Sequence, residues 1–249
     1  MGVVVAVLVV LTFKPVTPAP TSTVRPVSRT APWPTASVST QNTSVVVARL
    51  QQAQAEGRRP VVSVIGSSLV ESPKVPKFEN QWVWQVILSL QQATGGQLTL
   101  KMHSFPGTAL TKIVQEGVVA QVRVDKPDLV IFEASDPNNL GQNIGPDEAG
   151  RLVGQVLSGL SEKPAPLVVG FVGSPLVVDK HNGETLANYV AADVLAFKNA
   201  KVSVCDVGPA MVKAAAGNLM SILPDGVHPN VAGSLAWASA ANDCLVGPQ

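Results

Sequence analysis

The chain has 249 residues, of which 46% are hydrophobic and 14% charged, enough apolar material for one large domain or two small ones. Its formal net charge is +1 and no basic run is longer than Arg58-Arg59, which argues against a dedicated nucleic-acid surface. Aromatic residues make up 4%, so the sequence offers no obvious stacking platform for bases or long sugar chains.

The first segment, residues 1–13, is almost wholly apolar and ends at Lys14 and Pro15. It is too short to span a bilayer core, which takes about 20 residues in a helix. It matches the apolar part of a secretory signal, although the usual basic residues before it are missing. We expect a remnant of a signal or anchor, and therefore an exported, extracellular or membrane-anchored protein. A plain disordered tail is the alternative.

Residues 14–44 are rich in Pro, Thr and Ser and follow neither the helix nor the strand period. Because prolines interrupt helices and strands alike, we predict a disordered spacer or stalk here. A glycosylation sequon, Asn42-Thr43-Ser44, lies at its end, but a match this short is common by chance. The folded domain is expected to occupy residues 45–249.

Within this domain, helical segments alternate with short apolar, β-branched runs of the kind found in buried parallel strands. Ser44 is the predicted cap of the first helix, and Gly57 its end. The predicted helices are 45–56, 82–92, 108–124, 147–160, 184–198 and 230–244, and the predicted strands are 60–65, 97–103, 128–133, 167–172 and 201–206. This alternation predicts βαβ units, hence a parallel sheet with helices on both faces.

The two cysteines, Cys205 and Cys244, close a strand-like run and the last predicted helix respectively. An exported protein would join them as a disulfide, whereas a cytosolic one would keep two buried thiols, and the sequence leaves both open. Neither belongs to a CxxC or Cys/His pattern, so we expect no zinc site and no other cofactor.

Residues suited to acid–base chemistry follow the predicted strands, at the edge where parallel sheets bind ligands. Ser68 comes after the first strand and Gly66, which suits a sharp turn. Asp225 and His228 are three residues apart, so one helical turn places both side chains on one side. The carboxylate then accepts the Nδ1 proton, and Nε2 faces a serine hydroxyl. The alternatives are a plain connecting loop at Ser68 and a solvated helix start at Asp225.

Three segments resemble sequence blocks of the SGNH (GDSL-type) hydrolase superfamily. Val64-Ile65-Gly66-Ser67-Ser68-Leu69 is similar to the first block, Phe105-Pro106-Gly107-Thr108 to the second, and Pro224-Asp225-Gly226-Val227-His228-Pro229-Asn230 to the last, which is the most specific. The resemblance covers roughly residue 60 to the C-terminus. It implies an α/β fold, a three-layer α/β/α sandwich with a five-stranded parallel sheet of the flavodoxin-like, SGNH hydrolase type.

The resemblance also implies roles. Ser68 would be the nucleophile of a catalytic triad with Asp225 and His228, and the Ser68 and Gly107 amides would bind the oxyanion. The third block departs from the family's Gly-x-Asn-Asp, because the chain reads Ala134-Ser135-Asp136-Pro137-Asn138-Asn139 after its strand. We choose Asn138 as the side-chain donor to the oxyanion hole, with Asn139 as second choice.

Other residues receive structural interpretations. Ser67 replaces the aspartate that usually precedes the nucleophile, which weakens the resemblance more than the chemistry. We assign His103 and His181 to structural or surface roles. Glu133 is assigned to the edge of the core, with orientation of its neighbours as the alternative. Trp82 and Trp84 are assigned to helix packing, with the lining of an acyl pocket by one of them as the alternative.

The function implied is a serine esterase that hydrolyses a short-chain acyl ester, acetyl included, of a carbohydrate or lipid through an acyl-serine intermediate. One alternative is an O-acyltransferase that uses the same triad on a cell-surface polysaccharide. Another is a catalytically degenerate SGNH domain kept as a binding module. The expected partner is a small-molecule or carbohydrate ester, with no nucleic acid and with a membrane tether through the N-terminus. Oligomeric state is left open.

Overall fold

The computed structural model describes residues 42–178 and 180–247. The expected apolar remnant, 1–13, and the expected spacer as far as residue 41 lie outside the described residues. Within the described ranges, no helix combines the length and the hydropathy that crossing a membrane requires.

The central sheet consists of β1 (Val61–Gly66), β2 (Thr99–Ser104), β3 (Leu129–Glu133), β4 (Leu167–Val172) and β7 (Ser203–Asp206). All neighbouring strands are parallel, and their order is β2-β1-β3-β4-β7. Every residue of β3 is buried, as expected for a central strand covered on both faces. The order confirms the predicted flavodoxin-like sheet, in which the direction of winding reverses between the neighbouring strands β1 and β3.

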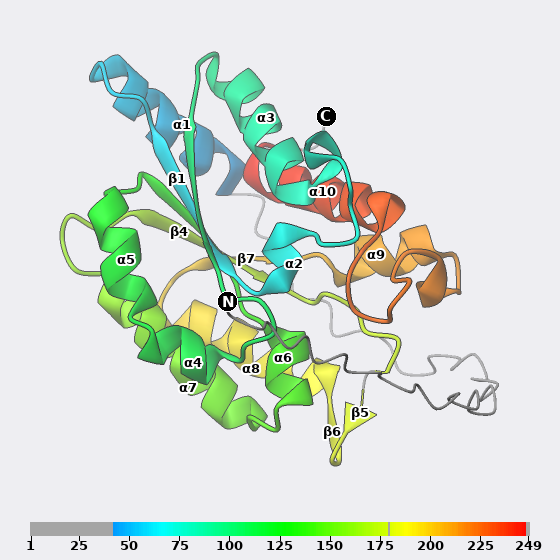
Figure 1. Cartoon of the computed structure of the whole chain (residues 1–249). Helices are drawn as coiled ribbons and strands as arrows, with labels where there is room; N and C mark the ends of the chain where they lie inside the picture. The colour runs from blue at the N-terminus through cyan, green and yellow to red at the C-terminus, as the bar shows by residue number, and fades with distance from the viewer. Residues whose placement is uncertain (1–41, 179, 248–249) are drawn as a thin grey trace, which may run out of the picture.

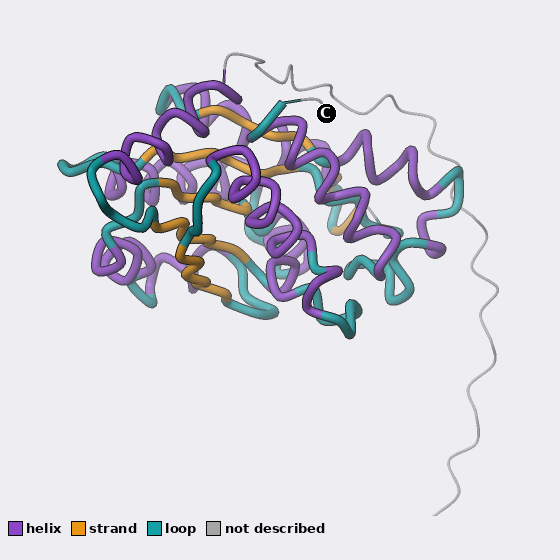
Figure 2. The backbone as a smooth tube through the Cα atoms, turned by 90° about the horizontal axis from the view of Figure 1, so that it is seen from above, coloured by secondary structure: helices purple, strands orange, loops and turns teal. Residues whose placement is uncertain are grey.

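Two helical layers enclose the sheet, which confirms the predicted three-layer sandwich (Figure 1). One layer contains α1 (Asn42–Ala55), α3 (Trp82–Thr94), α9 (Gly208–Ala215) and α10 (Val231–Leu245), and the other contains α4 (Leu110–Gln115), α5 (Val118–Asp125), α6 (Asp136–Gly141), α7 (Pro146–Leu160) and α8 (Leu186–Asn199). Seen from above, helices lie over the strands (Figure 2). Each layer has its own apolar core, with Trp82 stacked on Trp237 in the first and Phe132 against Phe197 in the second.

Several predicted boundaries are wrong for local reasons. Helix α1 begins at Asn42, so Ser44 lies inside it rather than at its cap. The first turn of a helix lacks internal acceptors for its N–H groups, and successive polar residues are therefore near-equivalent starting points. The predicted helix 108–124 is divided into α4 and α5 at Gly117, whose φ of +72° is the left-handed conformation that glycine tolerates.

The structure also contains short elements that the sequence did not predict. Ser68 begins a one-turn helix, α2 (Ser68–Glu71), and the loop expected after β3 contains α6, with Pro137 in its first turn. Helix α9, the 3-10 helices η1 (Phe78–Asn80) and η2 (Leu219–Ser221), and the hairpin of β5 (Lys180–His181) and β6 (Glu184–Thr185) complete this group.

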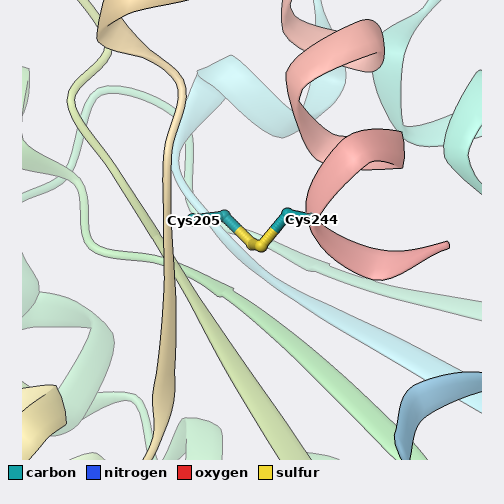
Figure 3. Close-up of a disulfide and its surroundings, with 2 residues drawn as sticks. All are labelled: Cys205 and Cys244. Carbon is teal, nitrogen blue, oxygen red and sulfur yellow. A yellow bond between two sulfur atoms is a disulfide. The ribbon is translucent and has the colours of Figure 1, made fainter. Parts of the chain in front are cut away.

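A disulfide links Cys205 of β7 to Cys244 of α10, with Cα atoms 5.9 Å apart (Figure 3). Both cysteines are buried. The disulfide therefore ties the last helix directly to the edge strand of the sheet, and it settles the alternative between bridge and free thiols.

Candidate active site

Ser68 stands at the carboxyl end of β1, as the first residue of α2. Ser67 caps this helix, and its hydroxyl accepts a hydrogen bond from the Leu69 N–H at 3.3 Å. The Leu69 carbonyl in turn accepts from Trp82 Nε1 at 2.8 Å, which ties α2 to the buried aromatic stack. Ser68 is thus the partly exposed first residue of a short helix whose first turn is held by hydrogen bonds at Leu69.

Gly66 is needed for space rather than for a sharp turn, which corrects the expectation from the sequence. Its φ is not positive, but a Cβ there would lie 2.7 Å from Glu133 Oε2 and 2.7 Å from Val70 Cγ1. Any side chain at this position would displace Glu133. The glycine therefore lets β1 and β3 end close together beneath Ser68.

His228 approaches Ser68 from the loop before α10. Its Nε2 lies 2.8 Å from Ser68 Oγ, although 160 residues separate the two in the chain. Its Nδ1 lies 3.0 Å from Asp225 Oδ2. The structure therefore brings the three predicted residues together as a continuous hydrogen-bonded chain from hydroxyl to imidazole to carboxylate.

The loop geometry of Asp225 explains why this histidine is well oriented. Asp225 Oδ1 accepts the backbone N–H groups of Val227 and His228, at 3.1 and 2.8 Å. Pro229 precedes the helix, and Asn230 caps it by accepting the Gly233 N–H at 3.1 Å. The segment before α10 is therefore a turn that places Asp225 and His228 face to face.

Asp225 stays ionised across the pH range in which a histidine base works. Partial burial by itself would raise its pKa, but the hydrogen bonds from His228 and Val227 outweigh it and hold the pKa of Asp225 well below its usual value. Lys74 Nζ lies 3.5 Å from Asp225 Oδ2, an exposed ion pair of small energetic weight. A permanently charged carboxylate is what stabilises an imidazolium formed at His228.

Glu133 orients its neighbours in the site, which was the alternative rather than the first interpretation of this residue. It is 3% exposed, and its two carboxylate oxygens accept the Ser67 and Ser135 N–H groups, each at 2.8 Å. Burial raises the pKa of Glu133 to about 7 despite these hydrogen bonds. An acidic residue closing an otherwise apolar strand was the available signal, but its partners could not be inferred without the fold.

Two of the three predicted oxyanion donors are backbone amides. Ser68 N–H belongs to the first turn of α2, where no internal acceptor exists. Gly107 occupies a turn closed by the Thr108 N–H and hydroxyl, which both donate to the Phe105 carbonyl. Its φ of +65° is left-handed, and its N–H has no hydrogen-bond partner among the residues described. Neither amide donates a hydrogen bond to a residue that the structure describes, so both can bind a ligand.

The two asparagines of the third block have different surroundings. Asn139 is buried, and its side chain is already hydrogen-bonded at both ends. Its Oδ1 accepts the Leu110 N–H at 2.9 Å, and its Nδ2 donates to the Ala134 carbonyl at 3.1 Å. Asn138 is partly exposed, lines a cleft, and its side-chain amide makes no hydrogen bond within the described part of the chain. Of the two, Asn138 alone has a side chain available to a substrate.

A buried acid pair lies behind this segment. Asp136, at the start of α6, and Asp193, in α8, are 2% and 0% exposed. Burial, and for Asp193 also the neighbouring charge of Asp136, raises the pKa of both carboxyls. They are close enough to hydrogen-bond when one is protonated, and Asp136 Oδ2 also accepts the Gly173 N–H at 3.3 Å. The pair links α6, which carries Asn138, to α8.

The remaining histidines lie outside this arrangement. His103 Nε2 lies 2.6 Å from Asp125 Oδ2, which also accepts the Ser63 hydroxyl. That serine is bonded to the aspartate and not to the imidazole, so the cluster links β1, β2 and α5 without presenting a nucleophile to a base. His181 is exposed in the β5–β6 hairpin.

A cleft of about 970 Å³ opens beside the site. Its lining residues come from α6, from residues 176–178 and β5, and from α9 with the loop that carries Asp225. Figure 1 shows α6 and α9 near the carboxyl ends of the strands. Asn138 and Asp225 both line it. Within the described ranges, no group of three or more His, Cys, Asp or Glu side chains has an arrangement suited to a metal ion.

Solved structures share this fold. A protein of Parabacteroides merdae that is named as a GDSL-like lipase aligns with a TM-score of 0.64 at 12% identity, over 76% of this chain and 95% of its own. The acetylxylan esterase Axe2 of Geobacillus stearothermophilus aligns with a TM-score of 0.59 at 17% identity, over 76% and 95%. The psychrotrophic esterase EstA of a Pseudoalteromonas species aligns with a TM-score of 0.59 at 13% identity, over 74% and 95%.

The sequence itself matches neither a protein-family model nor a curated protein. At such low identities the structural likeness concerns the fold: the chain has the fold of GDSL-type esterases and lipases. What the site does has to be argued from its own residues.

Proposed function

We propose that this protein is a serine esterase that hydrolyses a carboxylic ester of a carbohydrate or lipid through an acyl-serine intermediate. The observation that carries the proposal is the chain of contacts from Ser68 Oγ to His228 Nε2 at 2.8 Å, and from His228 Nδ1 to Asp225 at 3.0 Å. A serine hydroxyl is a weak nucleophile until a base accepts its proton, and this geometry supplies that base.

In the first step, Ser68 Oγ attacks the ester carbonyl carbon while His228 Nε2 takes the hydroxyl proton. The carbonyl electron pair moves onto oxygen, and the Ser68 and Gly107 amides together with the Asn138 side chain bind the resulting oxyanion. Collapse of the tetrahedral intermediate breaks the ester C–O bond. The leaving alcohol takes the proton from His228, and Ser68 remains acylated.

In the second step, water hydrolyses the acyl-serine. His228 accepts a proton from a water molecule as its oxygen attacks the acyl-serine, and then returns the proton to Ser68 Oγ as the carboxylic acid leaves. Asp225 holds the imidazole through Nδ1 and balances its positive charge in both halves. Product analysis with an added oligosaccharide acceptor distinguishes this hydrolysis from acyl transfer.

The test is turnover of p-nitrophenyl acetate by the purified protein, by Ser68→Ala and by Ser161→Ala. Ser161 is an exposed serine at the end of α7 and serves as the matched control. We expect Ser68→Ala to abolish release of p-nitrophenol and Ser161→Ala to leave it unchanged. Equal release by wild type and Ser68→Ala would contradict the proposal.

We also propose that the enzyme works outside the reducing cytosol. The Cys205–Cys244 disulfide supports an oxidising compartment, because disulfides seldom persist among cytosolic thiols. The expected result is that thiol alkylation of the protein, denatured without reductant directly from its source cells, adds no mass at either cysteine. Alkylation of both cysteines would count against export.

A further inference from the structure

The cleft beside Asn138 and Asp225 is large and aliphatic. At about 970 Å³ it lies at the upper end of the range of pockets that hold drug-sized ligands, so an acetyl group would leave most of it empty. Its lining is dominated by aliphatic side chains, chiefly those of Leu140, Leu176, Val177, Val212, Leu219 and Met220. No Trp, Tyr or Phe is found among the described residues that line it, so a sugar ring has no aromatic face to stack on.

The mouth of the cleft is also apolar. Val178 and Met220 both line it, and their side chains are 72% and 49% exposed. Exposing large apolar side chains to water is energetically unfavourable. Exposed apolar side chains that border an apolar cleft mark a place where an apolar ligand binds. Lys180, His181 and Asn218 supply a polar edge.

We infer that this cleft binds the acyl chain of the substrate and that the enzyme prefers esters of unbranched acids longer than acetate. The inference rests on the proposed esterase function. The leaving oxygen has to reach His228 Nε2, which faces Ser68. The cleft instead adjoins Asp225, which holds the opposite ring nitrogen, and Asn138, the proposed oxyanion donor. An acyl chain that extends away from His228 Nε2 therefore enters the cleft, whereas the alcohol leaves on the side of Nε2, away from the cleft.

The experiment compares two series of esters. The first keeps p-nitrophenol as the alcohol and lengthens the acyl chain from acetate to decanoate; the second keeps acetate and lengthens the alkyl alcohol. Burying one methylene group raises kcat/KM by about fourfold, so we expect a steady rise along the first series until the cleft is filled. The second series should stay flat. A preference for acetate, or a rise only in the second series, would overturn the inference.

Variants locate the effect. Val212→Phe on α9 adds volume inside the cleft, and we expect the ratio of octanoate to acetate kcat/KM to fall about tenfold. Val124→Phe, at an 80% exposed position on α5, is the matched control and should not change the ratio. Met220→Asp places a charge at the exposed mouth without burying it and should lower the same ratio. If both Val212→Phe and Met220→Asp leave the ratio at its wild-type value, the cleft does not bind the chain.

The inference and the proposed function fail differently. If Ser68→Ala has no turnover and the wild-type enzyme shows no chain-length preference, the proposed esterase function stands and the proposed acyl-chain site is wrong. If turnover persists in Ser68→Ala, both the proposed esterase function and the proposed acyl-chain site are wrong.

Discussion

Replacing Glu133 with glutamine tests how the end of β3 supports the strand ends around Ser68. The carboxyl is 3% exposed and accepts the Ser67 and Ser135 N–H groups. Glutamine has nearly the same shape but one acceptor oxygen, and its amide nitrogen would face an N–H donor. That loss costs about 1–3 kcal/mol when the wild-type carboxyl is ionised, because a buried N–H is then left without a partner in the variant alone.

The second effect depends on pH and has a definite sign. Burial raises the pKa of Glu133 from 4.5 to about 7. Between these values the folded protein keeps a proton that the unfolded chain has released, so the free energy of unfolding falls as pH rises. At about 1.4 kcal/mol per pH unit, a rise of this size gives a decrease of about 3 kcal/mol, complete above pH 7. Glu133→Gln cannot titrate and lacks this component.

The assay is urea unfolding of wild type and Glu133→Gln at intervals from pH 4.5 to 8.5. Other acids, Asp136 and Asp193 among them, titrate in both proteins, so the informative quantity is the difference between the two curves. We expect the stability of wild type relative to the variant to decrease by about 3 kcal/mol across the range. A difference that stays constant with pH would refute the assignment of a buried, raised-pKa carboxyl at this position.

Three further predictions concern the site and the disulfide. Asn138→Ala should lower kcat by roughly 10²–10³ with little change in stability. Asn139→Ala should instead lower the melting temperature, because two backbone groups lose their hydrogen-bond partner. Equal kcat for Asn138→Ala and wild type would show that another group donates to the oxyanion. Asp225→Asn should lower kcat by on the order of 10⁴ in steady-state assays, because the wrong imidazole tautomer is held, and a decrease of only a few-fold would contradict a role at Nδ1. Replacing Cys205 and Cys244 with serine removes a disulfide that joins residues 39 positions apart and restricts the unfolded chain. We expect the free energy of unfolding to fall by about 4 kcal/mol. An unchanged urea midpoint would contradict this stabilising role of the disulfide.

The sequence predicted the sheet well because β-branched apolar runs between helical segments allow few other arrangements. It also placed Ser68 and the Asp225–His228 turn at the same edge, since parallel strands all end there. The expected contact between the hydroxyl and the imidazole came from the family resemblance, and the turn at Asp225 that orients His228 could not be derived from the topology.

Other features depend on partners distant in the chain. Glu133 and Ser67 are 66 residues apart, and only the adjacency of β1 and β3 explains both that hydrogen bond and the absence of space for a side chain at Gly66. Helix α6 resembles a loop in sequence because Pro137 and two asparagines discourage helix, yet Pro137 fits its first turn. That the side chain of Asn139 is already hydrogen-bonded likewise could not be predicted, because its partner, the Leu110 N–H, lies 29 residues away in the chain.

The most direct measurement is active-site labelling with an alkyl fluorophosphonate, followed by intact mass and peptide mapping. Such a reagent phosphonylates a serine hydroxyl only when a neighbouring base activates it. We predict one adduct per molecule, on the peptide that contains Ser68, with none in Ser68→Ala and labelling at least about a hundredfold slower in His228→Ala. An unlabelled wild-type protein, or an adduct on any other residue, would contradict the account.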